Sequence, residues 1–207
     1  MKNPVPIYAI DFEGSKSLGI VEFGVAGLFE GEVFAAKTAM CAPRSRISAR
    51  DAAFFGITNE EAAAHPPFES HAGFFSEMRA GGILAAHSFH TEDSLLRSHI
   101  PSPGRVPDFL SGGDTLAWGP WLDSRLAAKA LMPGLDSEKL SSAISALGLL
   151  EELDAAALSM CPPGRAKWHC ALYDALASAL IIKKSLALFG SLDEAGFALG
   201  NARRGLF

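Results

Sequence analysis

Two acidic residues at the end of an apolar segment are the first candidates for chemistry in this chain. Residues 7–14 read Ile-Tyr-Ala-Ile-Asp-Phe-Glu-Gly, which is typical of a short strand that ends at a Gly-Ser break. Because side chains alternate along a strand, Asp11 and Glu13 share one face, opposite Ile10 and Phe12. Neighbouring carboxylates repel each other, and a divalent cation with oxygen ligands is the usual reason for such a pair. A lone pair more often marks a solvated strand end, so a metal site requires further acids elsewhere.

A second acidic stretch follows another predicted strand. Residues 82–88 are mostly apolar and end in His87 and Ser88, and Glu92 and Asp93 open a helix predicted over 92–100. Either acid could face the carboxyl end of the sheet. Acids in the first turn of a helix also suit the helix dipole without any catalytic role, and this stretch taken alone favours that interpretation.

The third candidate pair is His169 and Asp174. Five residues turn a helix by about 140° from the starting direction, so the two side chains cannot share a helical face. We therefore expect His169 in the loop or first turn before a helix predicted over 170–188, and Asp174 inside it. Alanine and leucine flank Asp174, and a carboxylate beside an apolar stripe is costly unless a positive partner meets it. The arrangement suits a rigid metal ligand and a more mobile base.

The other segments predict an α/β layer fold. Strands over 20–28 and 32–40 follow the first strand as an antiparallel meander, and strands and helices then alternate. Thr58 and Glu61 have the spacing of a capping box at a helix start. Further helices are predicted over 68–79, 123–131, 137–147 and 191–199, and a strand within 114–121. Residues 101–113 predict a surface loop, and residues 149–168 are mixed and end in a mobile loop over 161–165.

The amino-acid composition is typical of a soluble globular protein. The chain has 207 residues, of which 49% are hydrophobic and 20% charged, which argues against disorder. The net charge of -5 neither indicates nor excludes a nucleic-acid partner, because acids that hold metal count in it as free charge. Three cysteines without a C-x-x-C spacing predict reduced thiols and a cytoplasmic location. No signal-peptide pattern and no spanning apolar run is present in the sequence.

Taken together, the acids and the histidine resemble the DEDDh exonucleases of the DnaQ-like superfamily, which have a ribonuclease H-like fold. The resemblance covers nearly the whole chain, and its three motifs occur in order. The first is the D-x-E strand followed by Glu22-Phe23-Gly24, and a linking segment runs from Ile47-Ser48 to Phe55-Gly56-Ile57-Thr58. The family's A-H-N-x-x-F-D motif corresponds to residues 86–92, and H-x-x-x-x-D-A stands intact from His169 to Ala175.

The second motif departs from the family at two positions. Ser88 stands where the family has asparagine, and Glu92 stands where it has aspartate. Asp93 is the rival acid, but the register from His87 and from the pair Leu95-Leu96 favours Glu92. Glutamate keeps the charge and the oxygen ligands and adds one methylene group.

The resemblance implies a fold, a reaction and two metal ions. It implies an α/β, ribonuclease H-like three-layer fold with a mixed five-stranded sheet flanked by helices, and a single exonuclease domain over residues 1–207. The implied reaction is metal-dependent 3′–5′ hydrolysis that releases nucleoside monophosphates from DNA or RNA. Two Mg²⁺ or Mn²⁺ ions are implied, with Asp11 bridging both, Glu13 and Asp174 completing one, and Glu92 supporting the other. His169 would take the proton from the attacking water.

Substrate contacts and partners follow from the same resemblance. We expect Phe12, Gly14, Ser15, His87 and Arg165 to contact the substrate, although Phe12 also suits the core and Arg165 an exposed loop. The implied substrates are single-stranded DNA or RNA 3′ ends, and a homodimer and a polymerase partner are both compatible. One alternative function is a catalytically weak exonuclease-like module that binds nucleic acid or a polymerase. An unrelated metal-binding α/β scaffold would require the third motif to arise by chance.

Overall fold

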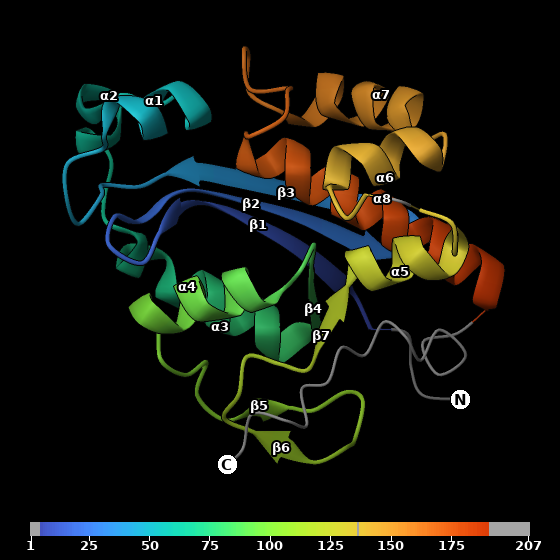
Figure 1. Ribbon diagram of the computed structural model, residues 1–207. Helices are drawn as coiled ribbons and strands as arrows, with labels where there is room; N and C mark the ends of the chain where they lie inside the picture. Colours follow the sequence, from blue (N-terminus) through green and yellow to red (C-terminus); the bar gives the residue numbers. More distant parts are fainter. Residues whose placement is uncertain (1–4, 136, 191–207) are drawn as a thin grey trace.

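The computed structural model describes residues 5–135 and 137–190 around a mixed five-stranded sheet (Figure 1). The strand order is β3-β2-β1-β4-β7, with β1, β2 and β3 antiparallel and with β4 and β7 parallel to β1. The predicted fold class is confirmed. The sheet strands are β1 (Ile7–Ser15), β2 (Gly19–Phe29), β3 (Glu32–Met40), β4 (Ile83–Ala86) and β7 (Trp121–Asp123), and β5 (Val106–Pro107) pairs separately with β6 (Asp114–Thr115).

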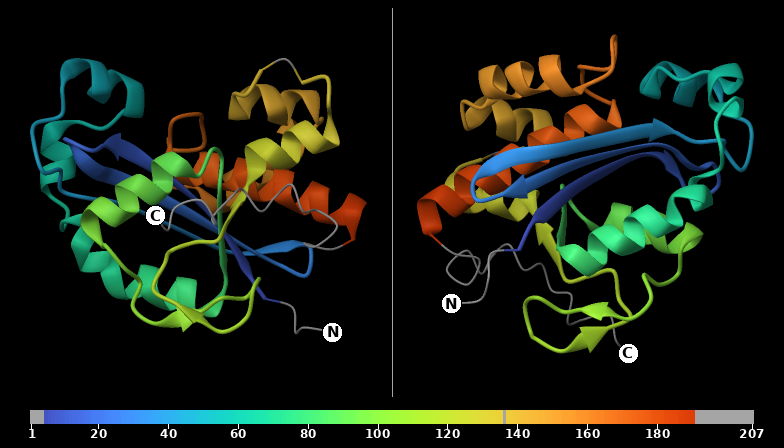
Figure 2. Two further views of the ribbon diagram at one scale, coloured as in Figure 1. Left: turned by 60° about the horizontal axis from the view of Figure 1, so that its bottom comes forward. Right: turned by 180° about the vertical axis from the view of Figure 1, so that it is seen from behind.

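Helices cover both faces of this sheet, as the views of Figure 2 show. On one face, α8 packs on β1 and β2, and α5, α6 and α7 pack against α8. On the other face lie α3 and α4, and the short helices α1 and α2 follow β3. The helices are α1 (Ala49–Phe55), α2 (Asn59–Ala63), the 3₁₀ helix η1 (Phe68–His71), α3 (Ala72–Gly81), α4 (His90–His99), α5 (Ser124–Leu131), α6 (Leu140–Ala146), α7 (Leu150–Met160) and α8 (Ala171–Phe189).

Alternation along β1 assigns its side chains to the two layers. Ile7 and Ala9 join the core under α8, whereas Ile10 and Phe12 join the core formed with α3 and α4. Because the period is two, the side chains of Asp11 and Glu13 lie on the α8 side of the sheet. The strand pattern of the sequence therefore places two acids under the helix that carries the third motif.

The structure refines three predicted segments. Residues 149–168, for which mixed structure ending in a loop at 161–165 was expected, contain helix α7 up to Met160. The short strand predicted within 114–121 is present as β6, but the last strand of the main sheet is β7, which begins at Trp121. The loop expected over 101–113 contains β5. The helix predicted over 191–199 lies outside the described residues. No helix among the described residues is long and apolar enough to cross a membrane.

Candidate active site

Four carboxylates from three separate elements lie close enough for their charges to interact. Asp11 and Glu13 come from β1, Glu92 from the first turn of α4, and Asp174 from the first turn of α8. Glu13, Glu92 and Asp174 are buried. The charges of these three act on Asp11, and ligand atoms of Glu13, Asp174 and His169 all lie within 4.8 Å of one another. Three of the five predicted catalytic residues thus form a close group, and Asp11 and Glu92 are linked to it through their charges.

Burial and mutual repulsion make these acids hard to ionise. Burial, together with the charges of Asp174 and Glu22, raises the pKa of Glu13 to about 8. Burial likewise raises the pKa of Asp174 to about 7 and that of Glu92 to about 8. The pKa of Asp11 is also well above its ordinary value, first from burial and then from the neighbouring carboxylates. Shifts of this kind are typical of functional sites.

Two buried oxygens of this cluster have no hydrogen-bond partner among the described residues. They are Oε2 of Glu92 and Oδ1 of Asp174. An unsatisfied buried polar atom is costly, so an uncompensated pair in one cluster indicates a missing positive partner. A donor set made only of carboxylate oxygens suits hard cations such as Mg²⁺ and Mn²⁺. The residues present therefore fit the metal that the sequence motif implies.

The Glu22-Phe23-Gly24 motif positions the beginning of α8. Gly24 is buried, and a Cβ atom added there would lie 2.2 Å from the carbonyl carbon of Ala171, so only glycine permits this close approach. Glu22 accepts the Ala171 N–H through Oε2 at 2.9 Å. Because Gly24 lies opposite Asp11 in the β1–β2 ladder, this contact brings the first turn of α8, with Asp174, over Asp11.

The carboxylate of Glu22 also tethers the loop before α8. Arg165 donates to Oε1 of Glu22 through Nε at 3.1 Å and to Oε2 through a terminal nitrogen. A second terminal nitrogen of Arg165 donates to the carbonyl of Phe55 at 2.9 Å. Glu22 is therefore a buried but fully partnered acid, in contrast to the acids of the cluster.

His169 lies just outside the helix, as predicted. The helix begins at Ala171, and His169 is exposed with a backbone φ of 63°, in the left-handed region. The backbone N–H of His169 donates to Oδ2 of Asp174 at 3.2 Å. The imidazole lies against the ring of Phe54, with 4.0 Å between the ring centroids. The histidine is thus accessible to solvent beside the buried acids.

The structure separates the two candidate acids of the second motif. Asp93 bonds to Arg97 at 2.8 Å and accepts the indole N–H of Trp121 at 3.0 Å, away from the cluster. Glu92 is buried, and its charge acts on Asp11. Asp123, the N-cap of α5, accepts the N–H of Ser88 at 3.0 Å and thereby fixes the turn before α4. The geometry agrees with the register that favours Glu92.

Two of the predicted substrate contacts line an open pocket at the end of β1. The pocket has a volume of about 420 Å³, and its other lining residues come from the turn after β1 and from α4. Gly14 and Thr91 in this lining are next in the chain to Glu13 and Glu92. The lining residues are Gly14, Ser15, Lys16, His90, Thr91, Ser94 and Leu95.

The other three predicted contacts are engaged within the protein. Phe12 is buried and packs against Phe68 and Phe75, with ring centroids 5.6 and 5.8 Å away. Nδ1 of His87 bonds to the hydroxyl of Ser124 at 2.9 Å, and Nε2 bonds to the carbonyl of Glu138 at 2.8 Å. Arg165 is held by Glu22, as described above. A substrate contact stays a prediction at all five positions.

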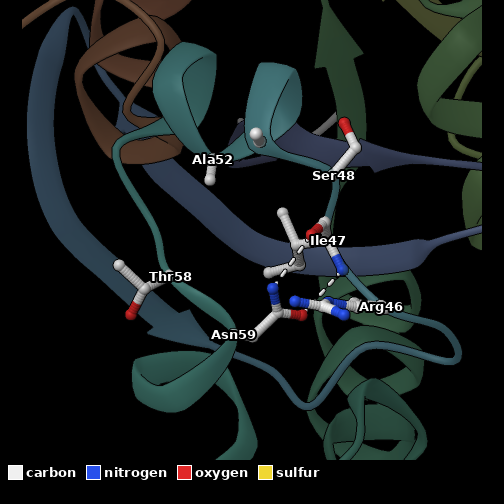
Figure 3. A pocket seen from close by; sticks show the side chains of 7 residues that line it. Arg46, Ile47, Ser48, Ala52, Thr58 and Asn59 are labelled. Atoms are coloured by element: carbon white, nitrogen blue, oxygen red, sulfur yellow. Dashed lines mark hydrogen bonds between the residues drawn. The ribbon is translucent and has the colours of Figure 1, made fainter.

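A larger pocket lies between α1 and α2 (Figure 3). Its volume is about 590 Å³, and it is lined by residues 46–49, 52, 58 and 59. The Asn59 amide spans its wall, accepting the Ile47 N–H at 2.8 Å and donating to the Ile47 carbonyl at 2.9 Å. These bonds fix the chain between the two helices.

Comparison with known proteins shows which fold the chain shares. No family model and no curated protein matches the sequence. Among solved structures, Exonuclease X in complex with 5′ overhanging duplex DNA matches 93% of this chain and 99% of its own, with a TM-score of 0.67 and 19% identity. The nuclease domain of 3′hExo, a DEDDh family member bound to rAMP, matches 90% and 94%, with a TM-score of 0.63 and 18% identity.

A third similar structure is Exonuclease I of E. coli in complex with a dT13 oligonucleotide, with a TM-score of 0.67 and 16% identity. It covers 93% of this chain, which spans 43% of the Exonuclease I chain. The described chain therefore has the ribonuclease H-like fold of DEDDh exonucleases over most of its length.

Sequence reasoning identified the acids but not the residues that hold them in place. Glu22 and Gly24 carried a visible signal, since they belong to the first motif, yet their contact with Ala171 needs the fold. Asp123 was visible only as a helix cap. Phe54 gave no signal, because two adjacent phenylalanines in a short helix do not reveal which one faces the histidine.

Proposed function

We propose that the chain is a metal-dependent 3′–5′ exonuclease that releases nucleoside monophosphates from nucleic-acid ends. The observation that supports this most is that ligand atoms of Glu13, Asp174 and His169 lie within 4.8 Å of one another, while the charges of Glu13, Glu92 and Asp174 all act on Asp11. The shared fold of DEDDh exonucleases adds to it. In this proposal residues 1–207 act as a single exonuclease domain.

Each residue has a defined role in the proposed reaction. The four carboxylates hold two Mg²⁺ or Mn²⁺ ions, which supply Lewis-acid stabilisation of phosphate charge when bound. His169 accepts the proton of the attacking water on a ring nitrogen, and its exposed position lets that proton pass on to solvent. The N–H of His169 and Oδ2 of Asp174 keep the base next to the acids.

The proposed substrate is the 3′ end of single-stranded DNA or RNA. The matched Exonuclease I structure contains dT13, and the matched 3′hExo structure contains rAMP. The pocket beside Gly14 and Ser15 accepts the terminal nucleotide, with hydroxyl and backbone groups along its wall. A homodimer and a polymerase partner are separate hypotheses, which sedimentation and co-purification would test.

Digestion of 5′-labelled single-stranded DNA and RNA with Mg²⁺ or Mn²⁺ tests the proposal. We expect a ladder that shortens from the 3′ end and disappears with chelator, with Asp174→Asn and with Glu92→Gln. Asp93→Asn is the matched control, because Asp93 neighbours Glu92 but faces Arg97 and Trp121, and it should keep the activity. If neither substrate shortens while single strands still bind, the chain is instead a binding module.

A further inference from the structure

An exposed phenylalanine stacks on the imidazole of His169. The ring planes of Phe54 and His169 are inclined at 35°, and their centroids are 4.0 Å apart. Phe54 is 54% exposed, so burial in the core does not account for an aromatic residue at this position. Contacts between aromatic rings are attractive beyond the effect of area burial.

The structure gives the imidazole no other anchor among residues 5–135 and 137–190. The hydrogen bond recorded for His169 comes from its backbone N–H, and the ring nitrogens bond to no described group. The residue also lies in a left-handed backbone conformation on an exposed loop. A histidine base is normally oriented by a hydrogen bond to its second ring nitrogen. Here the contact that restricts the ring is the face of Phe54.

The helix that carries Phe54 is itself fixed to the histidine loop. Helix α1 is capped by Ser48, whose hydroxyl accepts the Asp51 N–H at 3.1 Å. The carbonyl of Phe55, next to Phe54, accepts a hydrogen bond from Arg165 at 2.9 Å, and Arg165 belongs to the loop that leads into His169. The Arg165 side chain therefore links helix α1, which carries Phe54, to the loop that leads into His169.

We propose that Phe54 is a positioning residue, which holds the imidazole plane of His169 in the orientation that proton transfer requires. This inference rests on the proposed function, in which His169 is the base. A base must lie within hydrogen-bond reach of the water it deprotonates, and small misplacements are costly in rate. The stacked ring limits rotation of the imidazole while leaving both nitrogens free for solvent and substrate.

Steady-state kinetics on a labelled oligonucleotide separates this role from direct substrate stacking. Phe54→Leu keeps an apolar side chain but removes the planar face, and we expect kcat to fall by about tenfold with KM unchanged. Phe54→Tyr keeps an aromatic ring at this position and should therefore keep kcat close to the wild-type value. Phe34→Leu is the matched control, because Phe34 is 53% exposed but lies on the edge strand β3, and it should leave both constants unchanged.

A second background distinguishes the two roles further. In a His169→Ala protein, Phe54→Leu should cause no additional loss, because the residue acts through the imidazole. An equal loss in that background, or a rise in KM, would show instead that Phe54 stacks on a nucleobase and would overturn the inference. An unchanged kcat in Phe54→Leu would overturn it as well.

Nuclear magnetic resonance of the imidazole protons tests the contact without any activity. The chain has six histidines, so the His169 signals are assigned from their loss in His169→Ala. The ring current of Phe54 should shift these signals, and Phe54→Leu should move them toward free-histidine values. Static signals would refute the inference even in an active enzyme. If Phe54→Leu moves the His169 signals but the wild-type protein hydrolyses no nucleic acid, the proposed function is refuted while the contact between Phe54 and His169 stands.

Discussion

Neutralising either of two glutamates that are paired on neighbouring strands should change the free energy of unfolding in opposite directions. Glu13 in β1 lies directly opposite Glu22 in β2. Glu22 is satisfied by Arg165 and by the Ala171 N–H, whereas Glu13 faces the charges of Asp174 and Glu22. In metal-free protein at pH 8, we therefore expect Glu13→Gln to raise the free energy of unfolding and Glu22→Gln to lower it.

The size of the Glu13 effect follows from its pKa. Burial and like charges raise the pKa of Glu13 from 4.5 to about 8. Because a carboxyl pKa raised in the folded state means that folding favours the protonated form, the stabilisation is full below pH about 4.5 and is lost as the pH rises toward 8. At about 1.4 kcal/mol per pKa unit the upper limit is near 5 kcal/mol, and relaxation of the site should leave about 2–4 kcal/mol. The gain in Glu13→Gln should therefore be largest at pH 8 and vanish near pH 4.5.

The Glu22 effect follows from breaking a buried ion pair. Removing its charge leaves the Arg165 guanidinium without its carboxylate, and such losses cost about 3–5 kcal/mol in buried settings. The two substitutions are chemically identical and lie on neighbouring strands, so the comparison isolates the partner of each carboxylate.

Urea unfolding followed by circular dichroism, with chelator or with saturating Mg²⁺, measures both effects. Bound metal should stabilise the wild type and stabilise Glu13→Gln far less, so the advantage of the variant should disappear in Mg²⁺. A Glu13→Gln protein no more stable than wild type at pH 8 in chelator would refute the reasoning. So would two variants that shift in the same direction.

Three further outcomes are expected. Gly24→Ala should destabilise the protein by several kcal/mol and abolish hydrolysis, because the new Cβ would meet the Ala171 carbonyl carbon at 2.2 Å; thermal unfolding and the digestion assay would measure this, and a stable, active variant would contradict it. Ser88→Asn should raise the free energy of unfolding by about 0.5 kcal/mol in urea titrations, because Ser88 has a φ of 61° and asparagine tolerates that region better; an equal gain in Ser88→Ala would contradict it. The Mn²⁺ affinity measured by calorimetry should rise with pH and level off near pH 8, because the pKa values of Glu13 and Asp174 are raised to about 8 and 7. The rise should reach up to about tenfold per pH unit for each proton that the metal displaces. A pH-independent affinity would contradict this expectation.

The sequence predicts the antiparallel half of the sheet closely and the later elements less well. The strand predicted over 32–40 coincides with β3, because a Glu-Gly turn separates it from β2 and because the pattern is local. Residues 149–160 did not predict a helix because α7 has a weak apolar stripe. Leu153 and Ala157 are buried in it, while Leu150 and Leu158 are exposed. Strand β7 has three residues, too few for a period-two pattern to identify its bounds.

The acids and the histidine of the site were predictable because their residue types and spacing are visible in the sequence. The residues that hold them in place act through contacts between distant segments, which the sequence does not show. Alternation alone places Asp11 and Glu13 on one face, and helical geometry alone separates His169 from Asp174. The contact of Gly24 with Ala171 and the stacking of Phe54 on His169 join residues far apart in the chain. Such contacts depend on how α8 packs on the sheet and on where α1 lies relative to the loop before α8, which no local pattern specifies.

The buried and half-buried acids of the described sheet and helix ends divide into two groups, and this division supports the proposed metal site. Glu22 has a guanidinium and a backbone N–H, and Asp123 accepts the N–H groups of Ser88 and Arg125. Their charges are satisfied by the fold, and they hold α8 and the turn before α4 in place. No salt bridge within the described residues reaches the other group, and two of its oxygens are orphaned. That second group is Asp11, Glu13, Glu92 and Asp174.

Glu22 and Asp123 show that this fold provides partners for buried acids. The lack of an ion pair at Asp11, Glu13, Glu92 and Asp174 within the described residues is therefore not a general failure of packing. The hydrogen bonds of Glu22 and Asp123 fix the start of α8, which carries Asp174, and the turn before α4, which carries Glu92. Neighbouring carboxylates that no protein cation neutralises favour the binding of a metal cation. The partnered acids thus give a structural reason for the placement of the other four in the proposed metal-binding centre.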